Sequence, residues 1–103
     1  LNGQLHREDG PAIERPNGDK YWYINGKRHR EDGPAIEWAD GTKEWFINGQ
    51  LHREDGPAIE NANGDNFWYI KGNQLTEQEF IDRNKTELTL EEIANKFGIP
   101  INQ

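Results

Sequence analysis

The nine residues His29-Arg30-Glu31-Asp32-Gly33-Pro34-Ala35-Ile36-Glu37 occur three times in the chain without a change. The same letters begin at His6 and again at His52, so the copies recur with one constant 23-residue period. A fixed period of this length is the sequence signature of a repeat architecture, in which each unit is one small supersecondary element. The period therefore indicates the fold class before any single residue is considered.

Each 23-residue unit carries three dipeptides typical of tight turns, and in the middle of the chain these are Asp40-Gly41, Asn48-Gly49 and Asp55-Gly56. Asn-Gly and Asp-Gly favour two-residue hairpin loops, because a type I′ turn needs positive φ at both central residues. Counting outward from Asp40-Gly41 places Ile36 opposite Trp45. Residues opposite each other in an antiparallel pair share a face, so this register predicts one apolar face and one mixed face.

The two predicted faces alternate along each strand, as strand geometry requires. The face expected to be buried holds Ile13, Trp22, Ile24, Ile36, Trp45, Ile47, Ile59, Trp68 and Ile70. The second face is partly aromatic and partly acidic, and it holds Ala12, Glu14, Tyr21, Tyr23, Ala35, Glu37, Phe46, Ala58, Glu60, Phe67 and Tyr69.

The segment after each Asn-Gly turn allows two interpretations. Counting from Asn25-Gly26 places His29 opposite Trp22, and counting from Asp32-Gly33 places His29 opposite Ile36. Both counts place His29 on the same face, so a unit of three paired strands is consistent with the turn positions. A unit of two strands followed by an ordered connecting loop is the alternative.

Asn25-Gly26-Lys27-Arg28-His29, followed later by Asp40-Gly41, resembles the MORN repeat, whose units have a similar length and carry the same Asn-Gly-Lys and Asp-Gly elements. The resemblance covers about residues 1–72. It is closer to variant repeats of uncharacterised bacteriophage and bacterial proteins, because Arg-Glu-Asp stands where MORN has Gly-x-Gly. The resemblance implies an elongated, curved antiparallel sheet used for protein or lipid contact.

After Gly72 the turn signals stop and helix signals begin. Thr76-Glu77-Gln78-Glu79 and Thr89-Leu90-Glu91-Glu92 are both capping boxes, each followed by apolar residues. The predicted fold is thus mainly β: an antiparallel meander of three 23-residue hairpin repeats over residues 1–72, with two short helices over residues 73–103. We expect the helices to cover the last strand, which a repeat array leaves open.

The composition limits the class of protein. The 103 residues carry a net charge of −7 and include no Cys. Without Cys there is no disulfide framework and no thiolate nucleophile, which favours a cytoplasmic protein. The acidic balance argues against direct nucleic-acid binding, which depends on basic residues. No apolar run approaches the roughly 18 residues of a membrane span, so no membrane contact is expected.

His6, His29 and His52 recur beside acidic residues, which suggests a metal site. Equivalent residues lie two or three strands apart, and at about 4.8 Å per strand their separation is roughly 10–14 Å. A zinc ion needs its ligand nitrogens within about 2.1 Å, so ligation between units is excluded. Each His is instead expected to pack beside a Trp and to hydrogen-bond the neighbouring turn.

The charged residues give no catalytic set either. Glu14, Glu37 and Glu60 are too far apart for the roughly 5–9.5 Å of a glycosidase carboxylate pair. The chain has no Ser and no phosphate-binding glycine loop. The Arg and Glu residues of the repeated motif are expected to form a solvated edge. The sequence therefore predicts a protein that is not an enzyme and uses no metal or cofactor.

The aromatic residues of the second face are the predicted partner-binding site, because rigid aromatics rimmed by Arg are enriched at contact hot spots. The function expected is a protein-interaction module, of the kind found in a phage or bacterial accessory factor. An acidic mimic of nucleic acid that inhibits a nucleic-acid-binding protein is the alternative, and association with a second copy of the chain is left open. The predicted contact residues are Tyr21, Tyr23, Phe46, Phe67, Tyr69, Arg30 and Arg53.

Overall fold

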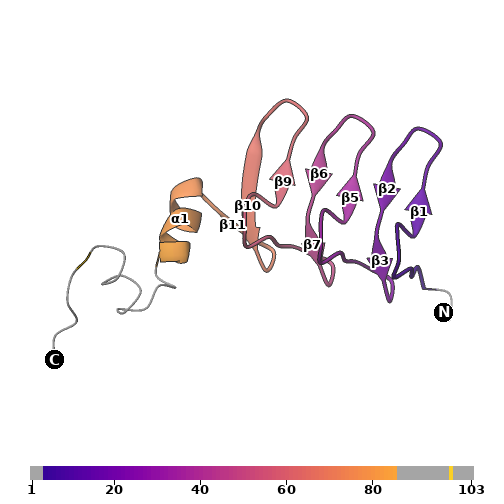
Figure 1. Cartoon of the computed structure of the whole chain (residues 1–103), viewed down its shortest axis with the longest axis horizontal. Coiled ribbons are helices and arrows are strands. Elements are labelled where there is room, and N and C mark those ends of the chain that lie inside the picture. The colour runs from indigo at the N-terminus through magenta and orange to yellow at the C-terminus, as the bar shows by residue number, and fades with distance from the viewer. Residues whose placement is uncertain (1–3, 86–97, 99–103) are drawn as a thin grey trace.

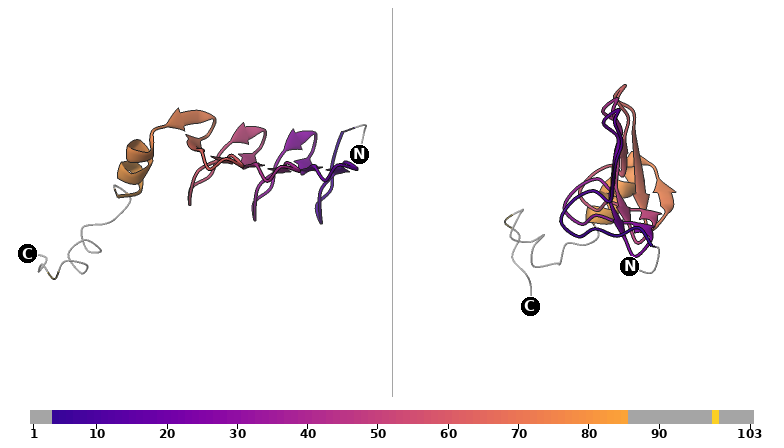
Figure 2. Two further views of the ribbon diagram at one scale, coloured as in Figure 1. Left: turned by 90° about the horizontal axis from the view of Figure 1, so that it is seen from above. Right: turned by 90° about the vertical axis from the view of Figure 1, so that its right-hand side faces the viewer.

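The computed structural model describes residues 4–85 and Gly98, and it is mainly β with one helix near the C-terminus (Figure 1). Long hairpins stand in a row and a short hairpin lies at the base of each (Figures 1 and 2). One antiparallel sheet has the strand order β1-β2-β5-β6-β9-β10-β11, and β3-β4 and β7-β8 form two small sheets. The strands are β1 Ile13–Glu14, β2 Lys20–Tyr21, β3 Tyr23–Ile24, β4 Lys27–Arg28, β5 Ile36–Glu37, β6 Lys43–Glu44, β7 Phe46–Ile47, β8 Gln50–Leu51, β9 Ile59–Glu60, β10 Asn66–Ile70 and β11 Asn73–Leu75.

The long hairpins have a loop one residue longer than the sequence suggests. In the β5–β6 hairpin the Gly41 amide donates to the Trp38 carbonyl (3.0 Å), and the Trp38 amide donates to the Thr42 carbonyl (2.9 Å). Gly41 has φ +98° and is the only residue of this loop with positive φ. This is a type I turn followed by a glycine bulge, and the loop comprises three residues.

The longer loop shifts the strand register by one residue. Ile36 lies opposite Glu44, so the prediction that Ile36 pairs with Trp45 is wrong. The β1–β2 and β9–β10 hairpins show the same shift, with Ile13 opposite Tyr21 and Ile59 opposite Phe67. Because strand side chains alternate with a period of two, a slip of one residue exchanges the faces of the partner strand.

The short hairpins confirm the type I′ prediction. Asn48 and Gly49 have φ +50° and +83°, and Ile47 lies opposite Gln50 across a two-residue loop. The β3–β4 hairpin is equivalent, and the His29 amide donates to the Trp22 carbonyl (3.1 Å), as the count from Asn25-Gly26 predicts.

The segment after each of the first two short hairpins, β3–β4 and β7–β8, is a connecting loop. Residues 29–35 contain no strand, and Gly33 has no positive φ, so Asp32-Gly33 is not a hairpin turn. Each unit therefore combines the two predicted interpretations, since a short third strand is present and an ordered loop follows it.

Neighbouring units are joined by backbone hydrogen bonds that recur at the 23-residue spacing. The Arg7 amide donates to the Tyr23 carbonyl (3.1 Å), and the Arg30 amide donates to the Phe46 carbonyl (3.1 Å). The next bond of this series runs from Arg53 to the Tyr69 carbonyl (3.2 Å). Each connecting loop is therefore held against the short hairpin that follows it.

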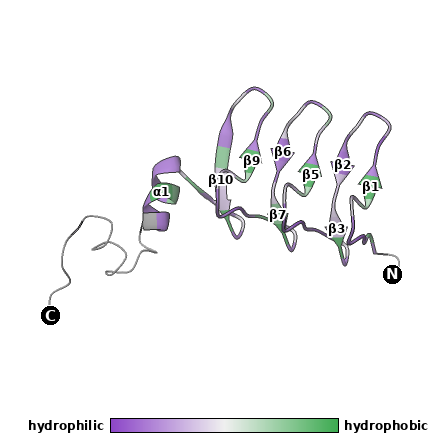
Figure 3. Ribbon diagram, in the orientation of Figure 1, coloured by the Kyte–Doolittle hydropathy of each residue, from purple (hydrophilic) through white to green (hydrophobic). Residues whose placement is uncertain are grey.

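The core is small and lies between the long hairpins. Ile36 is 1% exposed, Tyr21 9% and Phe46 7%, and Ala35 is fully buried with them. The tryptophans predicted to be core are only partly buried. Tyr21 and Phe46 come from the face predicted to bind a partner. Figure 3 shows the hydrophobic segments at β1, β5 and β9.

The helix α1, Glu77–Lys85, begins with the predicted capping box. The Glu79 amide donates to Thr76 Oγ1 (3.0 Å), and the Thr76 amide donates to Glu79 Oε1 (2.8 Å). The helix packs against β10 and β11 through Phe80, which is 7% exposed and lies 6.4 Å from the Trp68 ring. The second predicted helix falls on residues outside the described part of the chain.

Candidate binding site

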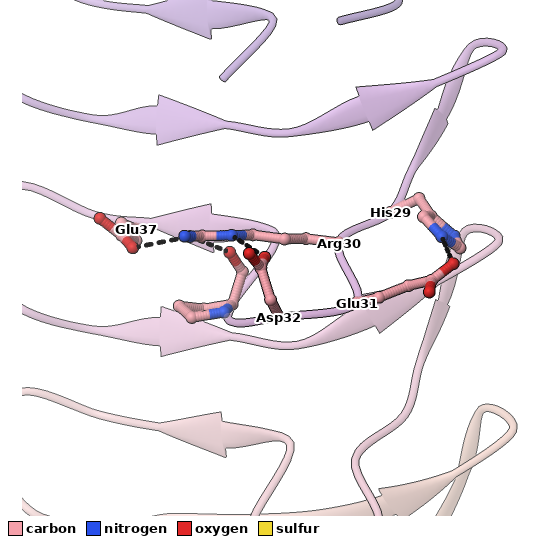
Figure 4. Close-up of polar contacts among 6 residues, drawn as sticks. His29, Arg30, Glu31, Asp32 and Glu37 are labelled. Atoms are coloured by element: carbon pink, nitrogen blue, oxygen red, sulfur yellow. Dashed lines mark hydrogen bonds and ion pairs between the residues drawn. The ribbon is translucent and has the colours of Figure 1, made fainter. Parts of the chain in front are cut away.

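The connecting loops, named here the HREDG loops (residues 6–10, 29–33 and 52–56), are organised around their arginines. The Arg30 guanidinium lies 3.9 Å from the Trp22 ring centroid. Its Nε donates to Asp32 Oδ1 (3.0 Å), and its NH1 donates to the Pro34 carbonyl (3.1 Å) and to Glu37 Oε2 (3.0 Å) (Figure 4). One planar cation therefore closes its own loop and also packs against the unit before it.

The same arrangement recurs at Arg53. Its guanidinium lies 3.8 Å from the Trp45 ring, and it bonds Asp55, the Pro57 carbonyl and Glu60. The Arg30 and Arg53 side chains are only 23% and 20% exposed, so the expectation of a solvated edge is wrong for them. Charge delocalisation and the flat shape of guanidinium explain this burial, because the group stacks on the indole while keeping its hydrogen bonds in the plane.

Glycine in the HREDG loop makes room for this cation. A Cβ added at Gly33 would lie 3.0 Å from Arg30 Cζ, and one added at Gly56 would lie 2.9 Å from Arg53 Cζ. Neither glycine has positive φ. These glycines are therefore selected by close packing and not by turn geometry.

Each loop histidine fastens its loop to the turn of the following short hairpin. His29 Nδ1 accepts a hydrogen bond from the Asn48 amide (2.9 Å), and its Nε2 lies 3.1 Å from Glu31 Oε2 (Figure 4). Because Nδ1 accepts, the proton of the neutral ring is on Nε2, which donates to the carboxylate. His6 and His52 make equivalent bonds to Asn25 and Lys71, so the predicted contact with the neighbouring turn is confirmed.

Two grooves lie between successive HREDG loops. The first has a volume of 530 Å³ and is lined by Trp22 and Ile24 between loops 6–10 and 29–33. The second has a volume of 680 Å³ and is lined by Trp45 and Ile47 between loops 29–33 and 52–56. Equivalent side chains of successive units thus form two neighbouring concave surfaces with the same chemistry.

The walls of the grooves are acidic and accessible. Each groove is lined by two arginines and four carboxylates, which leaves a net charge of −2 when the histidine is neutral. Glu31 is 81% exposed and Asp32 86%, and Glu8 and Asp9 opposite them are 80% and 86% exposed. An apolar floor between exposed carboxylates suits a ligand that is both apolar and cationic.

One carboxyl group of the first groove, that of Asp9, has a lowered pKa. The hydrogen bond from Arg7, together with its positive charge, lowers the pKa of Asp9 below its usual 3.8. Asp9 therefore stays ionised at neutral pH and contributes to the negative wall.

The structure separates the predicted contact residues into three groups. Tyr21 and Phe46 lie in the core, where a partner does not reach them. Tyr23 and Tyr69 are half-buried, and Phe67 is 36% exposed. The remaining two, Arg30 and Arg53, line the grooves.

Sequence reasoning missed the grooves because it assigned their floor to the core. Trp22, Ile24, Trp45 and Ile47 all belong to the predicted buried face. The available signal was the eight-residue spacing from Trp22 to Arg30, which recurs from Trp45 to Arg53. A constant offset between an indole and a guanidinium within one chain suggests stacking.

Within residues 4–85 and Gly98, no group of three His, Asp or Glu side chains is placed to hold a metal ion. No helix in the same part of the chain is long and apolar enough to span a bilayer. Comparisons with protein-family models, curated proteins and solved structures found no match to this chain.

Proposed function

We propose that the chain is a non-enzymatic protein-interaction module whose two grooves bind an extended, basic segment of a partner protein. The observation that carries the proposal is the recurrence of one groove chemistry at a 23-residue spacing. A segment lying along the row of hairpins meets the same floor and the same acidic walls twice. Two linked contacts raise the affinity of a weak single contact through effective concentration.

The chemistry of the groove favours Lys or Arg next to an aliphatic or aromatic side chain. The exposed carboxylates Glu31 and Asp32 attract a cation, while Trp45 and Ile47 offer apolar surface to the alkyl part of the same side chain or to its neighbour. Tryptophan and arginine are also the residues most enriched at binding hot spots.

The proposal includes the architecture suggested by the sequence. The three 23-residue units would form a MORN-like repeat array, elongated and curved, that a C-terminal helical segment closes. A cytoplasmic role as a phage or bacterial accessory factor is proposed on the resemblance to variant MORN-like repeats. Of the aromatic contact residues, Tyr23, Phe67 and Tyr69 retain exposure and stay in the proposal as secondary contacts.

An array of short peptides that vary in charge and aromatic content tests the groove proposal. We expect bound peptides to combine Lys or Arg with an apolar neighbour. The triple variant Glu8→Gln, Glu31→Gln and Glu54→Gln keeps an acceptor for each histidine but removes three groove charges, and it should bind about tenfold more weakly. Equal binding by the variant and the parent would contradict the proposal.

A matched control removes three charges elsewhere. Asp40→Asn, Asp65→Asn and Glu77→Gln lie outside both grooves and are exposed. Asn retains the side-chain acceptor that Asp40 offers to the Thr42 amide (2.9 Å). The control should bind the same peptides as the parent. Equal loss in both triple variants would show a non-specific charge effect.

Mimicry of nucleic acid is the second candidate, and the observation in its favour is the row of carboxylates that are 80–86% exposed in the first two HREDG loops. Salt distinguishes the two functions. A mimic relies on charge alone, so its binding to a nucleic-acid-binding protein should fall steeply between low and moderate salt. Groove binding includes contact with Trp and Ile and should fall less.

A further inference from the structure

The two grooves repeat along the molecule at the spacing of the units. One strand, β5, separates β2 from β6 in the large sheet, and Trp22 and Trp45 directly follow these two strands. Neighbouring strands lie about 4.8 Å apart, so the two groove floors are about 9.6 Å apart. Figure 1 shows the corresponding hairpins side by side in one row. A ligand that fills both grooves must therefore present equivalent side chains at this distance.

The HREDG loop of residues 29–33 separates the two grooves and belongs to the wall of both. Arg30, Glu31 and Asp32 line the first groove and also the second. Because a concave surface lies on each side of it, this loop is a ridge. The backbone of a ligand must cross the ridge between its two anchoring side chains, without pointing a further side chain at it.

The regular peptide conformations differ in which side chains lie this far apart on one face. In polyproline II, residues i and i+3 share a face because the helix has three residues per turn, and a rise of 3.1 Å per residue places them about 9.3 Å apart. In a β-strand, residues on one face are about 6.7 Å apart at i and i+2 and about 13 Å apart at i and i+4. Polyproline II therefore fits the groove spacing, and a β-strand does not.

An α-helix is the other conformation whose spacing comes close. Its residues i and i+7 lie about 10.5 Å apart on one face. Residues i+3 and i+4 of the helix lie on the same face between them and would meet loop 29–33. Polyproline II has no side chain on that face between i and i+3. The ridge therefore favours polyproline II over the α-helix.

The tryptophans of the two floors carry a hydrogen-bond donor that the chain does not use. Trp38 Nε1 donates to Glu44 Oε2 (2.8 Å). Within the described residues, Nε1 of Trp22 and of Trp45 makes no hydrogen bond, and neither atom is among the buried unpaired groups. Both indole N–H groups are therefore accessible to a ligand. Polyproline II makes no internal hydrogen bonds, so its backbone carbonyls can accept from them.

The acidic walls select the anchoring side chains. Lys or Arg at positions i and i+3 would place one cation between Glu8 and Glu31 in the first groove and one between Glu31 and Glu54 in the second. Pro at i+1 and i+2 keeps the segment in polyproline II, which docks in aromatic-lined grooves, and supplies the apolar neighbour of each cation. A segment that is already ordered before binding also loses less conformational entropy.

We infer that the ligand of the two grooves is a proline-rich polyproline II segment with Lys or Arg at positions i and i+3. Its prolines cross loop 29–33, and its carbonyls accept hydrogen bonds from Nε1 of Trp22 and Trp45. The inference rests on the proposed peptide-binding function and specifies the conformation and sequence pattern of the partner. Affinity then depends on the spacing of the cations and not only on their number.

Short peptides with blocked termini and equal charge test the spacing on the full 103-residue chain by fluorescence anisotropy. Lys-Pro-Pro-Lys has the predicted spacing, and Lys-Pro-Lys and Lys-Pro-Pro-Pro-Lys have one residue fewer and one more. We expect Lys-Pro-Pro-Lys to bind about fivefold more tightly than either, because only it fills both grooves. Lys-Gly-Gly-Lys keeps the spacing but is flexible, and it should bind about threefold more weakly.

A double variant, Trp22→Phe with Trp45→Phe, tests the indole donors. Phe keeps an aromatic ring beneath each arginine but lacks the N–H group, so we expect about fivefold weaker binding of Lys-Pro-Pro-Lys. Trp38→Phe is the matched control, because its indole donates within the chain and lies outside both grooves, and it should bind as the parent does. Circular dichroism compares the folding of the variants. Equal binding by the parent and a folded double variant would overturn the role of the indoles.

The outcomes of the peptide series distinguish this inference from the proposed function, and they need no variant to fold. Equal binding of all peptides of the same charge would overturn the polyproline II ligand and leave peptide binding standing. Tighter binding of a helical peptide with Lys at i and i+7 would overturn it in favour of an α-helix. No binding of any basic peptide would overturn the proposed function and this inference with it.

Discussion

Trp45 and Trp68 occupy equivalent positions in two consecutive units, yet different groups cover them. Arg53 stacks on Trp45 at 3.8 Å and is tied into its own loop by Asp55 and Glu60. Trp68 meets the Phe80 ring of α1 instead. A tryptophan followed by another unit is thus covered by a hydrogen-bonded cation, and the last one is covered by an apolar helix residue.

The difference shows that the HREDG loop holds two units together by packing against the unit before it, and does not lie free on the surface. The arginine of each of the two later loops stacks on an indole from the unit before it and pairs with a carboxylate from its own strand. Where no further loop follows in the described chain, a capped helix begins at the equivalent position and supplies an aromatic ring. The same tryptophan therefore accepts two chemically different partners, because an indole face stacks on both a cation and a ring.

The largest expected effect is on the free energy of unfolding, and it contrasts Phe46, a buried aromatic residue, with Phe67, a partly exposed one in the last long hairpin. Phe46→Ala should lower the free energy of unfolding by about 3 kcal/mol, because it empties a buried site, whereas Phe67→Ala should cost under about 1 kcal/mol. Urea denaturation followed by tryptophan fluorescence measures both. If Phe46→Ala left stability unchanged and abolished binding to a partner, Phe46 would be a contact residue as the sequence predicts.

The next effect tests the stacked cation. Arg53→Lys keeps the charge but loses the planar fork and the stacking on Trp45, so it should cost about 1–2 kcal/mol of unfolding free energy. Arg7→Lys should cost under about 0.5 kcal/mol, because Arg7 is half exposed and its ion pairs are weak. The ratio of the two losses, from urea denaturation, measures what the indole contributes. Equal losses would remove the distinction between interior and end loops.

Sequence reasoning succeeded where a local backbone requirement is specific. Positive φ at Asn48 and Gly49 is what a type I′ turn demands, and the Thr76 and Glu79 pair is a self-contained capping box. The hairpin class and α1 follow from such local signals.

The register failed because Asn-Gly and Asp-Gly each fit two kinds of hairpin loop, and the long hairpins at Asn17-Gly18, Asp40-Gly41 and Asn63-Gly64 all adopt the three-residue one. In Asp40-Gly41 only Gly41 has positive φ, and the turn starts one residue earlier than a type I′ count allows. The first unit contains a residue that distinguishes the two-residue loop from the three-residue loop. Pro16 stands at the first loop position of the β1–β2 hairpin, and Pro is favoured there in a type I turn. The grooves depend on this register and on contacts between units, which no single unit specifies.

A smaller effect on stability concerns the space that the loop glycine leaves for the guanidinium of its own loop, as Gly56 does for Arg53. Gly56→Ala should destabilise the chain by about 1 kcal/mol, because Arg53 is fixed by Trp45 and Glu60 and resists being pushed aside. Gly10→Ala meets Arg7 at 3.1 Å but should be close to neutral, since Arg7 has no stacked partner in the described structure and can move. Thermal unfolding followed by circular dichroism compares the two. A larger loss at Gly10 would show that backbone conformation and not arginine packing selects these glycines.

The smallest effect concerns the ion pair of the first loop, which lacks the stacking found in the interior. Arg7 lowers the pKa of Asp9 in the folded chain, so the ionised carboxylate stabilises the fold above its ordinary pKa of 3.8, and this contribution is lost as the pH falls through the lowered value. Asp9→Asn keeps an acceptor for Arg7 Nε but does not titrate. The Tm of the parent should therefore exceed that of Asp9→Asn near about pH 6, and the gap should close toward about pH 2.5. A gap that stays constant over this range would show that Arg7 does not lower the pKa of Asp9 in the folded chain.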